Sequence, residues 1–345
     1  MTPFRAATVR CGGQGGTGLI VHLLLVACWG LMACAPAGAA ELNAERINRA
    51  EFSGKPPPAD EVSPLGVRLQ VLLARAHFSP GEIDGKFGEN AKKALRAYAE
   101  AERLSTADRV TREIWQKLRS DDRPVLTTYD VTDKDIAGPF LAKLPARMED
   151  MQHLDGLNYT SASEALAERF HMSEQLLAAL NPHQPFRAGT RLVVADLAAG
   201  AGSVAQADRV EVDKVRQTVK VFDVSNGLID FYPATVGSED KPSPSGTLKI
   251  TSVDRNPFYG YNPKYHFKGV HTKSSFTIKP GPNNPVGTVW IQLPGEGYGI
   301  HGTPDPGKVS KAQSHGCVRL TNWDAERLAS EVKKGTPVAF VGGAS

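Results

Sequence analysis

Residues 300–320 have the sequence IHGTPDPGKVSKAQSHGCVRL, which combines one cysteine with two histidines and a turn-rich loop of glycines and prolines. The cysteine, Cys317, is an effective nucleophile only as a thiolate, so its ordinary pKa of about 8.5 must be lowered by an imidazole, a helix N-terminus or a metal. His301 and His315 both precede it in this stretch. The loop that starts at Gly302 can return His301 to the cysteine. The stretch therefore predicts an activated thiol.

Gly316, directly before the cysteine, lacks a side chain, so its backbone N–H can approach a developing oxyanion. Two other interpretations of Cys317 stay open from the residues alone. A lone cysteine is commonly a small buried hydrophobe, and His301, His315 and Cys317 are possible zinc ligands by type. The His-x-Cys spacing is not a usual structural zinc pattern and no second cysteine pair follows, so we expect no metal.

The composition is that of a globular protein and gives no sign of nucleic-acid binding. The chain has 345 residues, of which 41% are hydrophobic and 22% charged, and its formal net charge is +3. This length is sufficient for two or three domains. The net charge is too small to suggest nucleic acid as a partner.

Residues 1–40 have two arginines, an apolar run from Leu19 to Ala33 and then small residues, which predicts a cleaved secretory signal peptide. An alternative is a lipoprotein anchored at Cys34, because Leu31–Cys34 resembles a bacterial lipobox. Three of the four cysteines fall in this leader, so Cys317 is the cysteine of the remaining chain. A secreted protein that keeps one cysteine in an oxidising compartment is a candidate for thiol chemistry, which supports catalysis independently of the motif.

The C-terminal part of the chain has the period of two that is typical of strands. Strands are expected at 210–214, 219–224, 228–236, 247–253, 288–293 and 338–341, the first two as a hairpin. A helix is expected after the cysteine, with Thr321 and Asp324 at its start and Gly335 at its end. This predicts a mainly-β domain, a curved sheet or sandwich with one helix after Cys317.

His301-Gly302-Thr303 followed by Ser314-His315-Gly316-Cys317-Val318-Arg319-Leu320 resembles the active-site signature of the L,D-transpeptidases, the YkuD-type catalytic domain that remodels bacterial peptidoglycan. The similarity extends over about 209–342. The resemblance implies that Cys317 is the nucleophile, that His301 is the proton donor and acceptor, and that the Gly302 carbonyl orients His301.

The same resemblance implies an oxyanion hole from the N–H groups of Gly316 and Cys317. It also implies supporting roles for Ser314, His315 and Arg319; other branches have Asn where this chain has Arg319. An aromatic, proline-rich insert precedes the site, and by its position we expect it to cover the substrate as a lid. Its candidate contact residues are Tyr259, Tyr261 and His266.

Two accessory modules are expected before the catalytic domain. Residues 62–120 predict three short helices and resemble a peptidoglycan-binding domain, through Ile83-Asp84-Gly85, Phe87-Gly88 and Trp115–Leu118 among others. Residues 157–197 predict a strand, two helices and a strand, and resemble a degenerate LysM module through Leu180-Asn181-Pro182. The remaining segments are expected to be connections: a linker at 41–61, a spacer at 121–156 and a linker at 198–208.

The expected function is therefore a peptidoglycan L,D-transpeptidase of the periplasm or cell envelope that needs no cofactor. Cys317 would form a thioester with a stem tetrapeptide, release D-alanine and pass the acyl group to an amine. The acceptor would be a diaminopimelate side chain or a lysine of an envelope lipoprotein or outer-membrane protein. Alternatives are an L,D-carboxypeptidase or amidase that uses the same Cys-His pair, and a non-catalytic protein that binds cell-wall glycan. A papain-like protease is disfavoured because there the cysteine precedes the histidine.

Overall fold

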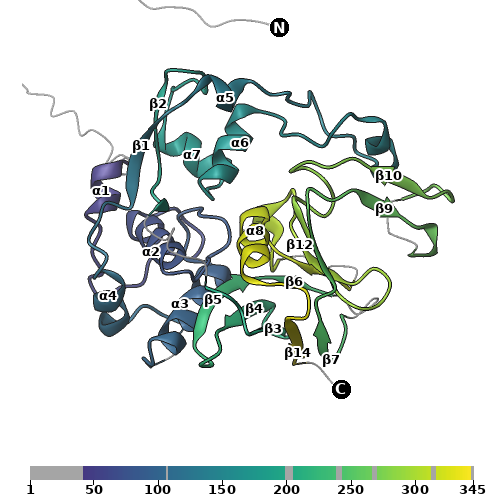
Figure 1. Ribbon diagram of the computed structural model, residues 1–345. Helices are drawn as coiled ribbons and strands as arrows, with labels where there is room; N and C mark the ends of the chain where they lie inside the picture. The colour runs from purple at the N-terminus through teal and green to yellow at the C-terminus, as the bar shows by residue number, and fades with distance from the viewer. Residues whose placement is uncertain are drawn as a thin grey trace, which may run out of the picture. The chain divides into compact units, whose positions relative to one another are not determined.

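The computed structural model describes residues 42–105, 108–198, 205–237, 243–265, 270–311 and 316–342 (Figure 1). From Leu42 onward the chain forms one compact unit. The helices are α1 (Ala44–Asn48), α2 (Pro64–Arg75), α3 (Glu89–Ala101), α4 (Arg112–Leu118), α5 (Asp133–Ile136), η1 (Met148–His153), α6 (Ala162–Arg169), α7 (Glu174–Leu180), η3 (Pro263–Tyr265), η4 (Pro306–Lys308) and α8 (Asn322–Glu331).

The strands are β1 (Leu126–Asp130), β2 (Arg191–Ala195), β3 (Arg209–Asp213), β4 (Thr218–Phe222), β5 (Leu228–Pro233), β6 (Thr235–Val236), β7 (Gly246–Lys249), β8 (Ser252–Arg255), β9 (Tyr259–Tyr261), β10 (Phe276–Ile278), β11 (Val289–Gln292), β12 (Gly299–His301), β13 (Val318–Arg319) and β14 (Pro337–Val341). Within the described ranges, no helix has the length and apolar character needed to cross a membrane.

Helices α2, α3 and α4 lie within 62–120, where three helices were expected. Ser63 caps α2 by accepting a hydrogen bond from the Gly66 N–H, and Pro64 occupies the first helical turn, where its missing N–H costs nothing. Thr111 caps α4 in the same way. The buried faces of these helices share one hydrophobic core with β1, β2, α6 and α7.

The segment expected as a linker, 41–61, differs from that expectation. It contains α1, capped by Asn43, and the side chain of Ile47 is fully buried. Asn48 accepts a hydrogen bond from the Leu126 N–H and donates one to the Leu126 carbonyl. The low apolar content of this segment suggested a linker, but the buried Ile47 and the two hydrogen bonds of Asn48 attach it to the core.

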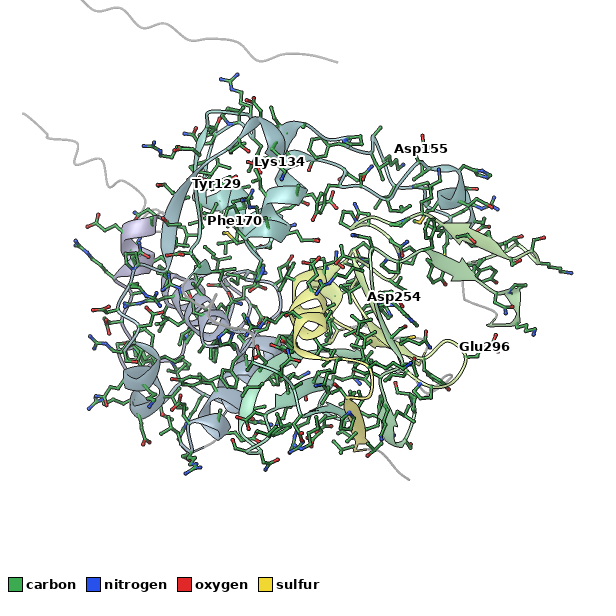
Figure 2. All side chains as sticks on the ribbon, in the orientation of Figure 1. Tyr129, Lys134, Asp155, Phe170, Asp254 and Glu296 are labelled. Carbon is green, nitrogen blue, oxygen red and sulfur yellow. The ribbon has the colours of Figure 1, made fainter. Side chains whose placement is uncertain are left out.

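The βααβ arrangement is present, but its first strand is β1 at Leu126–Asp130 rather than a strand near 157. β1 pairs antiparallel with β2, from Leu126 opposite Ala195 to Asp130 opposite Arg191. Tyr129 of β1 packs edge-on against Phe170 at the end of α6, with ring centroids 5.1 Å apart (Figure 2). Leu157, where the strand was expected, instead has its backbone hydrogen bonds with Pro280 and Asn283.

Residues 131–160 therefore form an insertion between β1 and α6 rather than a spacer. The insertion packs its apolar side chains against the β9–β10 hairpin in a third, smaller hydrophobic cluster. That cluster contains Leu141, Leu144, Met148, Met151, Leu154 and Leu157 from the insertion, and Tyr259, Tyr261, Val270, Phe276 and Ile278 from the hairpin side.

Two five-stranded sheets form the C-terminal part. The support sheet has the order β5-β4-β3-β14-β7, and the site sheet has the order β6-β13-β12-β11-β8. Val210, Val221 and Val338 of the support sheet share a buried core with Val289, Ile291 and Ile300 of the site sheet. The expected mainly-β architecture, the hairpin β3–β4 and the helix after Cys317 are confirmed. Helix α8 begins with Thr321 accepting from the Asp324 N–H.

The N-terminal region, residues 42–198, is bonded directly to this sandwich. The Ser79 hydroxyl donates to Asp324 of α8 at 3.0 Å, and the rings of His171 and Trp323 stack with centroids 4.9 Å apart. Ser79 and Phe231 of β5 are joined by a backbone hydrogen bond. The N-terminal region is thus packed against the C-terminal part through buried contacts.

Candidate active site

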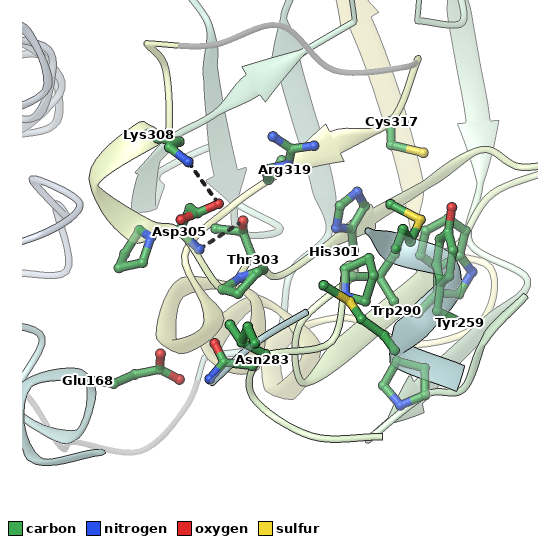
Figure 3. Close-up of a pocket in the computed structure, with 18 of the residues that line it drawn as sticks. Glu168, Tyr259, Asn283, Trp290, His301, Thr303, Asp305, Lys308, Cys317 and Arg319 are labelled. Carbon is green, nitrogen blue, oxygen red and sulfur yellow. Dashed lines mark hydrogen bonds and ion pairs between the residues drawn. The ribbon is translucent and has the colours of Figure 1, made fainter. Parts of the chain in front are cut away.

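The register of the site sheet places the predicted residues on its outer face. In the parallel pair β12–β13, Ile300 lies opposite Val318 and His301 opposite Arg319. Ile300 and Val318 belong to the buried core. Because side chains alternate between the two faces of a strand, His301 and Arg319 point away from that core. Cys317 precedes β13 and, two residues from Arg319, shares its face (Figure 3).

His301 is held by two contacts. Its Nδ1 lies 2.6 Å from the Gly302 carbonyl oxygen, and its ring stacks on Trp290 of β11 with centroids 5.5 Å apart. A carbonyl oxygen can only accept, so Nδ1 carries the proton and Nε2 has a lone pair available for a thiol. The geometry that the resemblance implied for Gly302 is therefore present.

The environment of His301 keeps the imidazole neutral at ordinary pH. Its side chain is 4% exposed, and burial lowers its pKa to about 3, with the positive charge of Arg319 acting in the same direction and the Gly302 hydrogen bond opposing it. A neutral imidazole can accept a proton, which is the property required of a general base.

Cys317 lies in a turn whose backbone is fixed on both sides. Its thiol donates a hydrogen bond to the Gly297 carbonyl at 3.1 Å. Gly316 has φ of +94°, a conformation that favours glycine, and its carbonyl accepts from the buried Ser243 hydroxyl at 2.9 Å. These contacts hold the Cys317 thiol in a defined place just before β13.

Arg319 adds positive charge beside the thiol. Its side chain is half-buried, and its Nε has no hydrogen-bond partner among the described residues. Burial lowers the pKa of the guanidinium, whereas the charges of Cys317 and Asp305 raise it. Arginine keeps its charge in proteins, so this side chain favours a thiolate at Cys317.

Of the two described tyrosines expected in the lid, one lines the cleft and one packs elsewhere. Both lie on β9, which pairs with β10 as a hairpin. Tyr259 lines the same cleft as Cys317, and burial raises its pKa, with Cys317 and Tyr261 adding to the effect. Tyr261 is 4% exposed and stacks on Phe276, so it is a packing residue. Ser314, His315 and His266 lie outside the described residues.

The cleft that contains Cys317 and His301 has a volume of about 1440 Å³ and is built from both halves of the molecule. Its lining includes Tyr259, Trp290, His301, Cys317 and Arg319 from the C-terminal part, and Glu82, Leu144, Met148, Met151 and Glu168 from the N-terminal region. Sequence reasoning missed the second group, because nothing local to those residues indicates a distant cysteine. Within the described ranges, no group of three or more His, Cys, Asp or Glu side chains is placed to hold a metal ion.

Comparison with known proteins places similarity in the same part of the chain. Residues 207–339 match the YkuD family, the L,D-transpeptidase catalytic domain. The putative L,D-transpeptidase YkuD of Bacillus licheniformis is 31% identical over 132 residues, covering 38% of this chain and 64% of that protein. YkuD of Bacillus subtilis is 32% identical over 117 residues, covering 34% and 56%. The probable L,D-transpeptidase YbiS of Escherichia coli K12 is 31% identical over 135 residues, covering 38% and 44%.

Among solved structures, L,D-transpeptidase 3 from Mycobacterium tuberculosis is similar with a TM-score of 0.32 and 18% identity, covering 39% of this chain and 60% of that one. The chain thus spans between about half and two thirds of the length of the curated YkuD relatives it matches.

Proposed function

We propose that this chain is a peptidoglycan L,D-transpeptidase that acts through a thioester on Cys317. The observation that carries the proposal is the parallel pairing of β12 with β13. It sets His301, already bonded through Nδ1 to Gly302, on the same face as Cys317 and Arg319. The match of residues 207–339 to the L,D-transpeptidase catalytic domain supports the same activity.

The proposed reaction begins with proton transfer from the Cys317 thiol to Nε2 of His301. The thiolate attacks the carbonyl of the third residue of a stem tetrapeptide, and the N–H groups of Gly316 and Cys317 stabilise the oxyanion. The imidazolium then donates its proton to the departing D-alanine amine, which leaves a thioester. His301 next accepts a proton from an acceptor amine, which attacks the thioester, and the thiol is restored.

The acceptor decides the biological product. A diaminopimelate amine gives a crosslink and a lysine of an envelope protein gives covalent anchoring. Water would give an L,D-carboxypeptidase with the same residues. We propose transfer to an amine as the main reaction, in the periplasm or envelope, to which the leader-like residues 1–40 would direct the chain; they lie outside the described residues.

We further propose that the N-terminal region binds cell wall, as its peptidoglycan-binding-like and LysM-like sequences suggest. The succession of α6, α7 and β2, with β2 paired to β1 across the 131–160 insertion, supports the second resemblance. Binding of a Cys317→Ala variant to purified sacculi, compared with that of residues 205–345 alone, tests this role. Equal retention of both proteins would reject it.

The catalytic proposal is tested by mass spectrometry of residues 42–345 with disaccharide-tetrapeptide, using wild type and Cys317→Ala. We expect a wild-type adduct that has lost D-alanine and a crosslinked dimer as product. A tripeptide product without dimer would indicate hydrolysis instead. Absence of any Cys317-dependent adduct, with sacculus binding retained, would favour a non-catalytic wall-binding protein.

A further inference from the structure

Glu168 of α6 accepts a direct hydrogen bond from α8 in the C-terminal part of the molecule. Its Oε1 accepts from Nδ2 of Asn322 at 2.9 Å and from the Tyr159 hydroxyl at 3.1 Å. Asn322 is the first residue of α8 and is 1% exposed. The two partners are 154 residues apart in the chain, so the contact exists only in the folded protein.

The orientation of the Asn322 amide is determined by its other partners. Its Nδ2 also donates to the Pro282 carbonyl at 3.1 Å, and its Oδ1 accepts from the Thr288 N–H at 3.2 Å. Two acceptors therefore face Nδ2 and one donor faces Oδ1, so exchanging the two ends of the amide would lose all three hydrogen bonds. Glu168 supplies the side-chain acceptor of this set.

The Asn322 side chain lies against the residue that orients the catalytic histidine. A Cβ atom built on Gly302 would overlap Oδ1 of Asn322, and so would one built on Gly287. The Gly302 carbonyl, in turn, accepts from Nδ1 of His301 at 2.6 Å. In a close-packed interior a shift of the Asn322 amide is passed to the Gly302 peptide, because no free space absorbs it.

We propose that Glu168 is a positioning residue for His301, acting through Asn322 and the Gly302 peptide. Helix α6 of the N-terminal region then contributes to the orientation of His301 and does not only pack beside the catalytic centre. This inference rests on the proposed function only in taking His301 as the base that activates Cys317.

Removing the Glu168 carboxylate leaves α6 docked through other bonds. Nδ2 of Asn283 donates to Glu164 Oε1 at 2.8 Å and to the Asn158 carbonyl at 3.0 Å. The Asn283 N–H also donates to the Leu157 carbonyl. A Glu168→Ala variant is therefore expected to fold, with its defect confined to the acceptor lost by the Asn322 amide and the Tyr159 hydroxyl.

Glutamine at this position keeps the critical acceptor. Burial raises the pKa of Glu168 to about 7, against the opposing hydrogen bonds from Asn322 and Tyr159. Glutamine resembles the protonated carboxyl, whose carbonyl oxygen still accepts from Asn322. Glu168→Gln is the rescue variant. Glu168→Asp keeps the charge but is one methylene shorter, so it should behave as Glu168→Ala does.

The test is the rate of Cys317 alkylation by iodoacetamide between pH 5 and 9, in wild type and the three Glu168 variants. We expect Glu168→Ala and Glu168→Asp to react about tenfold more slowly at pH 7, with a midpoint shifted toward that of an ordinary thiol. Glu168→Gln should stay within about twofold of wild type. With tetrapeptide substrate, kcat should fall while KM stays unchanged, because the histidine is misplaced and substrate binding is not.

The matched control is Glu100→Ala, which removes another carboxylate that joins the N-terminal region to the sandwich, through Lys220 of β4, without touching Asn322. Wild-type alkylation in Glu168→Ala and Glu168→Asp, or an equal loss in Glu100→Ala or Glu168→Gln, overturns the proposal. A raised KM with normal alkylation overturns it too, because that marks a direct substrate contact. Alkylation needs no peptidoglycan, so rapid His301-dependent alkylation without transpeptidation would reject the proposed function alone.

Discussion

The two five-stranded sheets share one core but differ in what their outer faces do. The support sheet carries Lys220 on β4, paired with Glu100 of α3, on the side toward the N-terminal helices. The site sheet carries His301, Arg319 and Trp290 on the wall of the cleft. One outer face carries an ion pair with the helices, and the other carries the residues of the proposed active site.

Strand length follows the same division. The strands of the support sheet have four to six residues, whereas those of the site sheet have two to four. Short strands end early, so loops at Gly297, Gly302 and Gly316 bring backbone groups to the cysteine and histidine. The longer paired strands of the support sheet stabilise the fold, and the short strands of the site sheet leave room for the loops that form the candidate site.

The largest effect is expected on activity rather than on stability, when Cys317 at the outer face of the site sheet is replaced. Cys317→Ala should reduce kcat/KM for stem peptide by at least about a thousandfold, because no other described thiol can form the thioester. The free energy of unfolding should change by less than about 0.5 kcal/mol, since the side chain is partly exposed. Kinetics and urea unfolding measure the two quantities. Strong destabilisation would mean that the outer face also carries the fold.

A substitution in the shared core should have the opposite result, a large loss of stability with little change in thiol reactivity. Ile291 of β11 is fully buried, one residue from Trp290 but on the opposite face. Ile291→Ala should lower the free energy of unfolding by about 2–4 kcal/mol through lost burial and a cavity. Alkylation of Cys317 in the folded fraction should change little. If the alkylation rate of Cys317 in the folded fraction also falls strongly, packing on the inner face of this sheet controls the thiol on its outer face.

A buried carboxyl beside the site sheet should give a pH signature. Asp324 of α8 is 3% exposed, and burial raises its pKa to about 7, with hydrogen bonds from Ser79 and Thr321 opposing. Between pH 4 and 7 the folded state therefore binds more protons at this group than the unfolded state. Its contribution to stability is present below about pH 4 and is lost as the pH rises to about 7.

Asp324→Asn should remove that loss, so the variant should gain up to about 4 kcal/mol relative to wild type as the pH rises from 4 to 7. Urea unfolding at intervals of one pH unit measures the difference. Asp230→Asn, which changes a buried carboxyl of β5 in the support sheet, is a useful comparison. Parallel curves for wild type and Asp324→Asn would show that Asp324 is ionised in the fold throughout this range.

The smallest effect is expected at the outer face of the support sheet. The Lys220–Glu100 pair is 2.6 Å long, but the Glu100 side chain is 44% exposed. Glu100→Ala should cost about 0.5 kcal/mol or less, and the cost should shrink in 0.5 M salt as screening increases. Unfolding at low and high salt measures this. A loss above 2 kcal/mol would make the ion pair, rather than the shared core, the main link between helices and sheet.

Local sequence carried most of the site and the regular part of the fold. The stretch around Cys317 indicated the cysteine and the histidine as candidates, and its resemblance to the L,D-transpeptidase signature implied the role of Gly302. The structure places His301 beside the strand that follows Cys317 and bonds its Nδ1 to the neighbouring Gly302 carbonyl. The strands β3 and β4 were predicted from alternation, since each buries one face of a simple hairpin. The strands β12 and β13 were missed because two or three residues carry too little periodicity.

Tertiary structure decided the rest. The first strand of the βααβ unit, the packing of residues 131–160 on the β9–β10 hairpin, and the contact of Glu168 with Asn322 all join residues far apart in the chain. The sequence by itself indicated which side chains are candidates for the chemistry and which segments alternate, because motif composition and side-chain periodicity are local properties. The sequence does not show which distant surfaces complete the cleft. Those contacts form only in the folded chain, where the burial of apolar area and the pairing of polar groups offset the conformational entropy lost on folding and loop closure.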